Sequence, residues 1–265
     1  MTTIGVEVIG GDGGEPILVL PGGGVRSPEY LGDVRVWGVS RPLAVVYYRG
    51  TPRTGGLPGP WWDQFDDLEG VRRELGLSSV EVIAHSAGAR VALAYAASGA
   101  PVRRMALVAP PATWLTGTES DVETLAAARA DEPLIVAALA APPLDLRDEA
   151  EYREWLRVTA PLGYARWDAA AERHSATGTT SFEALRAFFM APIPDALLAR
   201  IPALTLPVHV IGGAADLLSG RAPVEALAGM FTNGSVELIA DCGHYPWIDQ
   251  PAAYAAALSR WSAAG

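Results

Sequence analysis

The sequence contains no lysine: all 20 basic residues in the chain of 265 are arginines. A chain without lysine cannot form a Schiff base with a carbonyl substrate, anchor a pyridoxal cofactor or place a Walker-type lysine on a phosphate. Cysteine is almost as scarce. Because Cys242 is the only cysteine, the chain can form neither an intrachain disulfide nor a cysteine-based metal site.

Excess positive charge and long apolar runs are also missing. The net charge is −10 and the pI is near 4.9, which argues against binding to a nucleic-acid backbone. No uncharged apolar stretch reaches the roughly 20 residues of a membrane-spanning helix. Residues 1–8 lack the basic stretch and apolar run of a signal peptide. We therefore expect a cytoplasmic protein with neither a membrane nor a nucleic-acid partner.

The chain does contain short apolar runs of strand length, many of them rich in β-branched residues. Most lack strict alternation, as expected for strands buried on both faces of a parallel sheet. They lie at 17–20, 44–48, 80–84, 105–109, 208–211 and 236–240, with a moderately alternating edge-strand candidate at 4–9. Helix-like segments lie between them, at 62–75, 87–97 and 251–261. Strands alternating with helices predict an α/β fold with a mostly parallel, doubly wound sheet.

The alternation stops between Pro110 and Pro207, where no strand pattern occurs. Helices are expected instead at 121–130, opened by a capping box of Ser120 and Glu123, and at 148–159, 164–174 and 182–190. We predict a helical cap of residues 111–205, inserted after the sixth strand into a core of residues 1–110 and 206–265. A cap there would cover the sheet edge at which open α/β sheets bind ligands. The alternative is an ordinary run of packing helices.

A candidate nucleophile follows the third parallel strand, where residues 80–84 lead into His85-Ser86-Ala87-Gly88 and a helix. A strand, a sharp turn and a helix are the setting in which a catalytic serine is presented. The turn requires small residues two positions before and after the serine, and Ala84 and Gly88 meet this requirement. The pattern predicts Ser86 as the nucleophile. The alternative is a serine that caps the helix.

A serine nucleophile needs a base, and the sequence offers only four histidines. His244 follows the last predicted strand on a loop shaped by glycine and proline, which makes it the predicted base. His85 adjoins the serine, but the turn points the two side chains in different directions. His209 lies in mid-strand, as a core residue would, and His174 lies in the predicted cap.

The acid of a triad should follow the strand that resumes after the cap. There, a glycine turn ends in Asp216, which could fix the tautomer of the base and stabilise its imidazolium. The resulting order, Ser86, Asp216, His244, differs from the orders of the chymotrypsin and subtilisin proteases. Asp241 and Asp249 are closer to the base in sequence, and either could orient it instead.

A glycine triplet after the first parallel strand, Gly22-Gly23-Gly24, is the candidate oxyanion loop. Consecutive glycines allow backbone N–H groups to approach a ligand without obstruction. We predict that the N–H groups of Gly23 and Ala87 hold the oxyanion, with Gly24 as the alternative donor in the loop. The alternative for the triplet is a flexible turn.

Four segments together, 21–24, 48–51, 84–88 and 243–247, resemble the proline iminopeptidase-like group (peptidase family S33) of the α/β-hydrolase superfamily. The resemblance implies the α/β-hydrolase fold and a serine hydrolase that forms an acyl-enzyme. Its substrate would be an N-terminal aminoacyl amide, proline or similar, in a small peptide or natural-product intermediate. The sequence departs from the group where Pro21 replaces a histidine and Tyr47-Tyr48 replaces Asp-Gln.

In this group, acidic residues of the cap bind the free amine of the substrate. Glu172 is the nearest local match to their motif, and the resemblance leaves Glu151, Glu154 and Asp168 as other candidates. The aromatic residues expected to contribute to a substrate pocket are Trp155, Trp167 and Tyr245. The alternative is that these carboxylates are simply solvated on helix faces and that the tryptophans pack in the core.

Two other functions remain open. The same triad would serve an esterase or thioesterase acting on a small acyl substrate, and the absence of a cap carboxylate near Ser86 would favour this function. The fold also supports non-hydrolytic uses, such as a lyase, a cofactor-free oxygenase or a binding scaffold. We expect no cofactor and no metal, and the expected partner is a small molecule or short peptide. The oligomeric state is not predicted.

Overall fold

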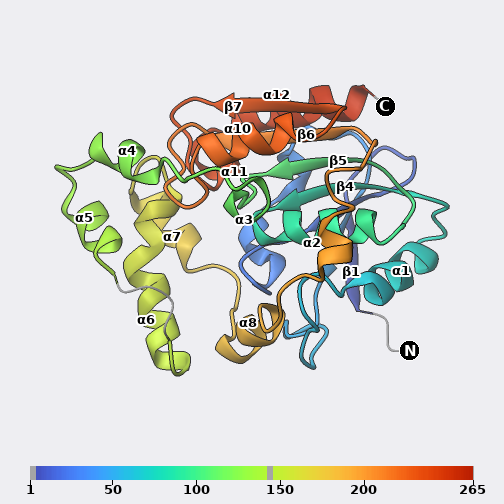
Figure 1. The fold of residues 1–265 in the computed structure, drawn as a ribbon, viewed down its shortest axis with the longest axis horizontal. Coiled ribbons are helices and arrows are strands. Elements are labelled where there is room, and N and C mark those ends of the chain that lie inside the picture. The colour runs from blue at the N-terminus through green and yellow to red at the C-terminus, as the bar shows by residue number, and fades with distance from the viewer. Residues whose placement is uncertain (1–3, 142–145, 265) are drawn as a thin grey trace.

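The computed structural model describes residues 4–141 and 146–264, and its centre is a seven-stranded sheet of order β1-β3-β2-β4-β5-β6-β7 (Figure 1). The first strand, β1, pairs antiparallel with β3, and all other pairings are parallel. The strands are β1 (Gly5–Ile9), β2 (Ile17–Leu20), β3 (Leu43–Tyr47), β4 (Val80–His85), β5 (Val102–Val108), β6 (Val208–Gly213) and β7 (Gly234–Ile239). This confirms the predicted mostly parallel sheet and its antiparallel edge strand.

The continuous apolar runs of the central strands follow from helices that cover both faces of the sheet. In β2, Leu18 and Leu20 join the core on one face, with α1 (Phe65–Glu74), α2 (Ala87–Ala97) and α10 (Ala222–Gly229). The residues between them, Ile17 and Val19, join the core on the other face, with α12 (Pro251–Ala263) and the short helices η1 (Pro28–Leu31) and η2 (Val34–Val36). All four β2 side chains are therefore buried.

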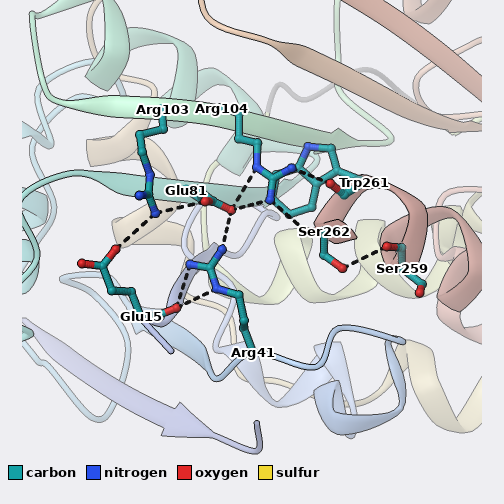
Figure 2. A network of polar contacts seen from close by, with 8 residues as sticks. All are labelled: Glu15, Arg41, Glu81, Arg103, Arg104, Ser259, Trp261 and Ser262. Atoms are coloured by element: carbon teal, nitrogen blue, oxygen red, sulfur yellow. Dashed lines mark hydrogen bonds and ion pairs between the residues drawn. The ribbon is translucent and has the colours of Figure 1, made fainter. Parts of the chain in front are cut away.

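A buried ionic network fixes the start of β4 and β5 to the last helix (Figure 2). The carboxylate of Glu81 accepts hydrogen bonds from Nε and Nη2 of Arg104 at 3.0 and 2.8 Å and from Nη1 of Arg41 at 2.8 Å. Arg104 also donates to the carbonyl oxygen atoms of Trp261 and Ser262. Both charges are almost fully buried, so each depends on the other for its solvation.

A helical segment separates β5 from β6. It comprises α3 (Thr113–Thr116), α4 (Val122–Ala127), α5 (Pro133–Leu139), α6 (Glu149–Thr159), η3 (Ala160–Gly163), α7 (Ala169–Ser175), α8 (Phe182–Phe188) and α9 (Asp195–Leu198). Figure 1 shows α4 to α7 gathered beside the sheet, next to α11 (Pro246–Asp249). We predicted that this segment follows the sixth strand. In the described part of the chain it follows the fifth, because only five strands, β1 to β5, precede it and a single strand, β1, lies before β2. The division into core and cap domains stays a prediction.

Side-chain capping explains where α7 begins but not where α4 begins. The predicted capping box of Ser120 and Glu123 does not form, since Asp121 occupies the N-cap position and its side chain makes no cap hydrogen bond. The helix expected from residue 164 begins only at Ala169, because the side chain of Asp168 accepts hydrogen bonds from the backbone N–H groups of Ala170 and Ala171. No helix among the described residues is long and apolar enough to cross a membrane.

Candidate active site

Ser86 lies in the sharp turn between β4 and α2, with φ 50° and ψ −122°. Backbone strain of this kind persists only where the surroundings enforce it, and it is concentrated at functional sites. The turn presses the chain against the neighbouring strand: a Cβ atom on Gly88 would lie 2.4 Å from the carbonyl oxygen of Leu20. A Cβ atom on Gly22 would lie 2.7 Å from Cβ of Ser86. The local geometry is therefore that of a nucleophile elbow.

His244 and Asp216 form a buried pair. Nδ1 of His244 lies 2.9 Å from Oδ2 of Asp216 and 3.3 Å from Oγ of Ser219. The other oxygen of Asp216 accepts hydrogen bonds from the backbone N–H groups of Leu218 and Ser219, and the residue is only 1% exposed. A carboxylate at Nδ1 keeps the ring proton there, which leaves Nε2 free to accept a proton.

The two alternative carboxylates have other positions. Oδ2 of Asp249 accepts hydrogen bonds from the backbone N–H groups of Gly243 and Ala165, at 2.7 and 2.9 Å. Asp249 thus ties the loop before His244 to the helical segment, and burial raises the pKa of its carboxyl. Asp241 is exposed, and its backbone φ of 49° marks a tight turn. Of the three candidates, Asp216 is the one hydrogen-bonded to the imidazole.

His85 connects the glycine loop to the loop of His244. The N–H of Gly22 donates to the hydroxyl of Tyr30 at 2.6 Å, and this hydroxyl lies 2.9 Å from Nδ1 of His85. Nε2 of His85 lies 3.0 Å from the carbonyl oxygen of His244, so Nε2 carries the proton and Nδ1 accepts from Tyr30. Burial holds the pKa of His85 well below its usual value, which keeps this chain of hydrogen bonds intact.

The remaining histidines also have structural partners. In His174, Nε2 donates to the carbonyl oxygen of Tyr30 at 2.6 Å, and Nδ1 accepts from the hydroxyl of Tyr164 at 2.7 Å. Burial lowers the pKa of His174 to about 4. His209 is half-buried in β6, and its Nδ1 lies 2.8 Å from Oγ of Ser235.

A cavity of about 470 Å³ opens over the turn. Its walls include Ser86 and His244 together with the two predicted oxyanion donors, Gly23 and Ala87. Ala87 is the first residue of α2, so its N–H has no partner inside the helix. Gly24 also lines the cavity. The structure therefore brings the predicted nucleophile, base and oxyanion donors to one cavity, with the predicted acid directly behind the base.

The predicted substrate-binding residues divide into two pairs. Trp155 and Tyr245 line the cavity, whereas Glu172 is exposed on α7 and Trp167 packs against Tyr164 outside the lining. The other carboxylate candidates are engaged elsewhere: with Arg147 (Glu151), with Arg157 (Glu154) and at the start of α7 (Asp168). None of the described residues that line the cavity is an aspartate or glutamate. The described lining therefore lacks the carboxylate that would bind a protonated amine.

The cavity is instead lined by three arginines, Arg26, Arg90 and Arg153. Arg153 forms an ion pair with Glu149 at 2.9 Å. Arg26 donates to backbone carbonyl groups, among them that of Ser175 at 2.9 Å. Sequence patterns did not single out Arg90, yet its position one helical turn after Ser86 was a signal that could have found it.

The sequence matches the model of the alpha/beta hydrolase family over residues 17–257. The chain therefore belongs to the alpha/beta hydrolase family, a family of hydrolytic enzymes. None of the curated proteins matches the sequence. The described residues contain no group of three or more histidine, cysteine, aspartate or glutamate side chains that could hold a metal ion.

Solved structures share this fold at low sequence identity. An esterase from Exiguobacterium antarcticum is similar with a TM-score of 0.68 and 17% identity, covering 98% of this chain and 95% of that one. A thermophilic esterase from Thermogutta terrifontis gives 0.63 and 21%, covering 97% and 92%. An alpha/beta fold family hydrolase from Bacillus anthracis str. Sterne gives 0.69 and 16%, covering 96% and 97%.

Proposed function

We propose that the protein is a serine esterase that hydrolyses a small ester or thioester through an acyl-enzyme on Ser86. One observation carries this function: a serine in a strained turn and a histidine that is paired with a buried aspartate line one cavity, whose described lining contains no carboxylate. The serine, histidine and aspartate support acyl transfer. The charge of the lining favours an ester over a substrate with a free, protonated amine.

In the proposed reaction, Oγ of Ser86 attacks the carbonyl carbon while Nε2 of His244 takes the hydroxyl proton. Asp216 stabilises the resulting imidazolium, and the oxyanion accepts hydrogen bonds from the N–H groups of Gly23 and Ala87. His244 returns the proton to the departing alkoxide or thiolate, which leaves an acyl group on the serine. Water then attacks this acyl group with the same base, and the carboxylic acid and the free serine are formed.

Removal of an N-terminal aminoacyl group is the second candidate, and the resemblance of four sequence segments to the proline iminopeptidase-like group favours it. Such a substrate carries a positive charge next to the scissile carbonyl. In this cavity that charge would meet guanidinium groups and no described carboxylate, which is electrostatically unfavourable. We therefore rank the esterase function first.

The test compares p-nitrophenyl acetate and butyrate with prolyl- and alanyl-p-nitroanilide, using wild type and Ser86→Ala. We expect turnover of the esters alone, with a fall of about 10⁴-fold or more in Ser86→Ala. Ser259→Ala is the matched control, since Ser259 is an exposed serine on α12. Anilide turnover that needs both the serine and a free amine would replace this proposal with the aminoacyl function. Inactivity on every substrate would favour a non-hydrolytic use.

A further inference from the structure

Arg90 is a charged side chain without a charged or hydrogen-bonding partner in the cavity of the proposed active site. It lies in α2 and lines the same cavity as Ser86. Within the described part of the chain, no carboxylate or carbonyl group accepts a hydrogen bond or forms an ion pair with it, and its buried Nε has no hydrogen-bond partner. The other two arginines of the cavity each have acceptors, so Arg90 alone among them has none.

Aromatic rings hold this guanidinium in place. Its Cζ lies 4.9 Å from the ring centre of Trp114, 5.7 Å from that of Trp61 and 5.8 Å from that of Phe189. Cation–π contacts of this kind position a cation but supply no hydrogen-bond acceptor. Burial without an acceptor lowers the pKa of Arg90 to about 10, so the group stays charged at neutral pH.

Burying a guanidinium without an acceptor is energetically unfavourable unless an anion accepts its hydrogen bonds. The chain provides no such anion among its described residues, and the remaining source is the molecule that enters the cavity. The planar guanidinium matches a carboxylate with two parallel hydrogen bonds. Arg90 lies four positions after Ser86, a rise of about 6 Å along the helix, so the carboxylate would belong to the same small molecule as the ester.

We propose that Arg90 is a substrate-binding residue and that the natural substrate is an ester or thioester bearing a carboxylate, which the Arg90 guanidinium binds. This inference rests on the proposed hydrolysis at Ser86 and specifies its substrate class. The carboxylate lies either on the acyl part, as in a half-ester of a dicarboxylic acid, or on the leaving alcohol. The guanidinium would bind the carboxylate in the same way at either position, and matched pairs of substrates distinguish the two positions.

The kinetic test uses two matched pairs of esters. Monomethyl and dimethyl adipate place a carboxylate or a neutral ester on the acyl part, and 4-acetoxybenzoate and its methyl ester do so on the leaving group. In wild type, we expect a higher kcat/KM for the charged member of one pair. Arg90→Met, which keeps the apolar contacts with the rings, should lower this preference by at least about tenfold. Arg90→Lys should retain part of it.

Arg200→Met is the control for the loss of one positive charge, because Arg200 is exposed and lies outside the cavity. It should keep the wild-type preference. An equal loss of activity toward charged and neutral esters in Arg90→Met would show that the residue only supports the structure and would overturn the proposal. Equal use of both members of both pairs by wild type would also overturn it.

Calorimetry separates this proposal from the proposed hydrolysis. The Ser86→Ala protein should bind the charged member of at least one of the two pairs, and its Arg90→Met derivative should bind the same molecule at least about tenfold more weakly. If no ester is hydrolysed but this Arg90-dependent binding is found, the carboxylate site stands and the hydrolase function fails. If esters are hydrolysed but binding does not depend on Arg90, the carboxylate site fails and the hydrolase function stands.

Discussion

Replacing Tyr30 with phenylalanine tests whether the hydrogen-bonded chain beneath the active site holds the oxyanion loop in place. The hydroxyl accepts from the N–H of Gly22 at 2.6 Å and contacts Nδ1 of His85 at 2.9 Å, and Tyr30 is 1% exposed. Tyr30→Phe leaves one buried donor and one buried acceptor without partners. At about 1–3 kcal/mol each, this should lower the free energy of unfolding by roughly 2–6 kcal/mol.

The same substitution should reduce activity through kcat. Gly22 directly precedes the proposed oxyanion donor Gly23, so a displaced loop weakens contacts made only in the transition state. We expect kcat to fall about tenfold or more with KM little changed, which is a loss of about 1.4 kcal/mol of transition-state stabilisation or more. Urea denaturation and ester kinetics measure the two effects.

Tyr47→Phe is the matched control, because Tyr47 donates to Glu7 at the edge of the sheet and does not line the cavity. It should change stability by less than about 1 kcal/mol and leave kcat unchanged. The reasoning is refuted if Tyr30→Phe unfolds within about 0.5 kcal/mol of wild type and retains its kcat. A loss of stability with unchanged kcat would refute the link to the oxyanion loop alone.

Three further predictions test other parts of the structure. Glu81→Gln leaves the buried charge of Arg104 without its ion-pair partner and should lower the free energy of unfolding by about 3–5 kcal/mol in urea titrations. Arg103 is an exposed arginine 3.0 Å from the same carboxylate, and Arg103→Gln should cost less than about 1 kcal/mol. Asp216→Asn should reduce kcat by about 10⁴-fold with the fold retained by circular dichroism, as in the serine-protease triad. The pKa of His174 is about 4 when folded, below its unfolded value, so the unfolded chain binds more protons as the pH falls from about 6.5 to 4. Wild type should lose stability over this range, and His174→Gln should flatten part of that slope; equal slopes would contradict the account.

Local signals predicted the sheet well, and residues 80–97 form the expected strand, sharp turn and helix. Residues 17–20 and 87–97 were predicted with the ends that β2 and α2 have in the structure. Both segments are specified by contiguous residues: a fully apolar run, and an alanine-rich helix that ends before Gly99. The pairing of His244 with Asp216 was also predicted, because both residues follow strands of a sheet whose strand order the fold class fixes.

Features that depend on distant contacts could not be predicted in the same way. Tyr30 meets His85 across 55 positions, and no local pattern marks that pair. The role of Asp249 as a clamp on the loop depends on Ala165, 84 positions away. The exposure of Glu172 follows from the rotation of α7, which the packing of Ala171 and His174 sets and which its short sequence leaves open.

Trapping the acyl-enzyme tests the central claim most directly. The protein is mixed with p-nitrophenyl butyrate, quenched in acid during turnover, digested and examined by mass spectrometry. The account predicts a butyryl group on the peptide that contains Ser86, present in wild type and in Ser259→Ala but absent from Ser86→Ala. Hydrolysis that proceeds with an acyl group on another residue, or that continues undiminished in Ser86→Ala, would contradict it.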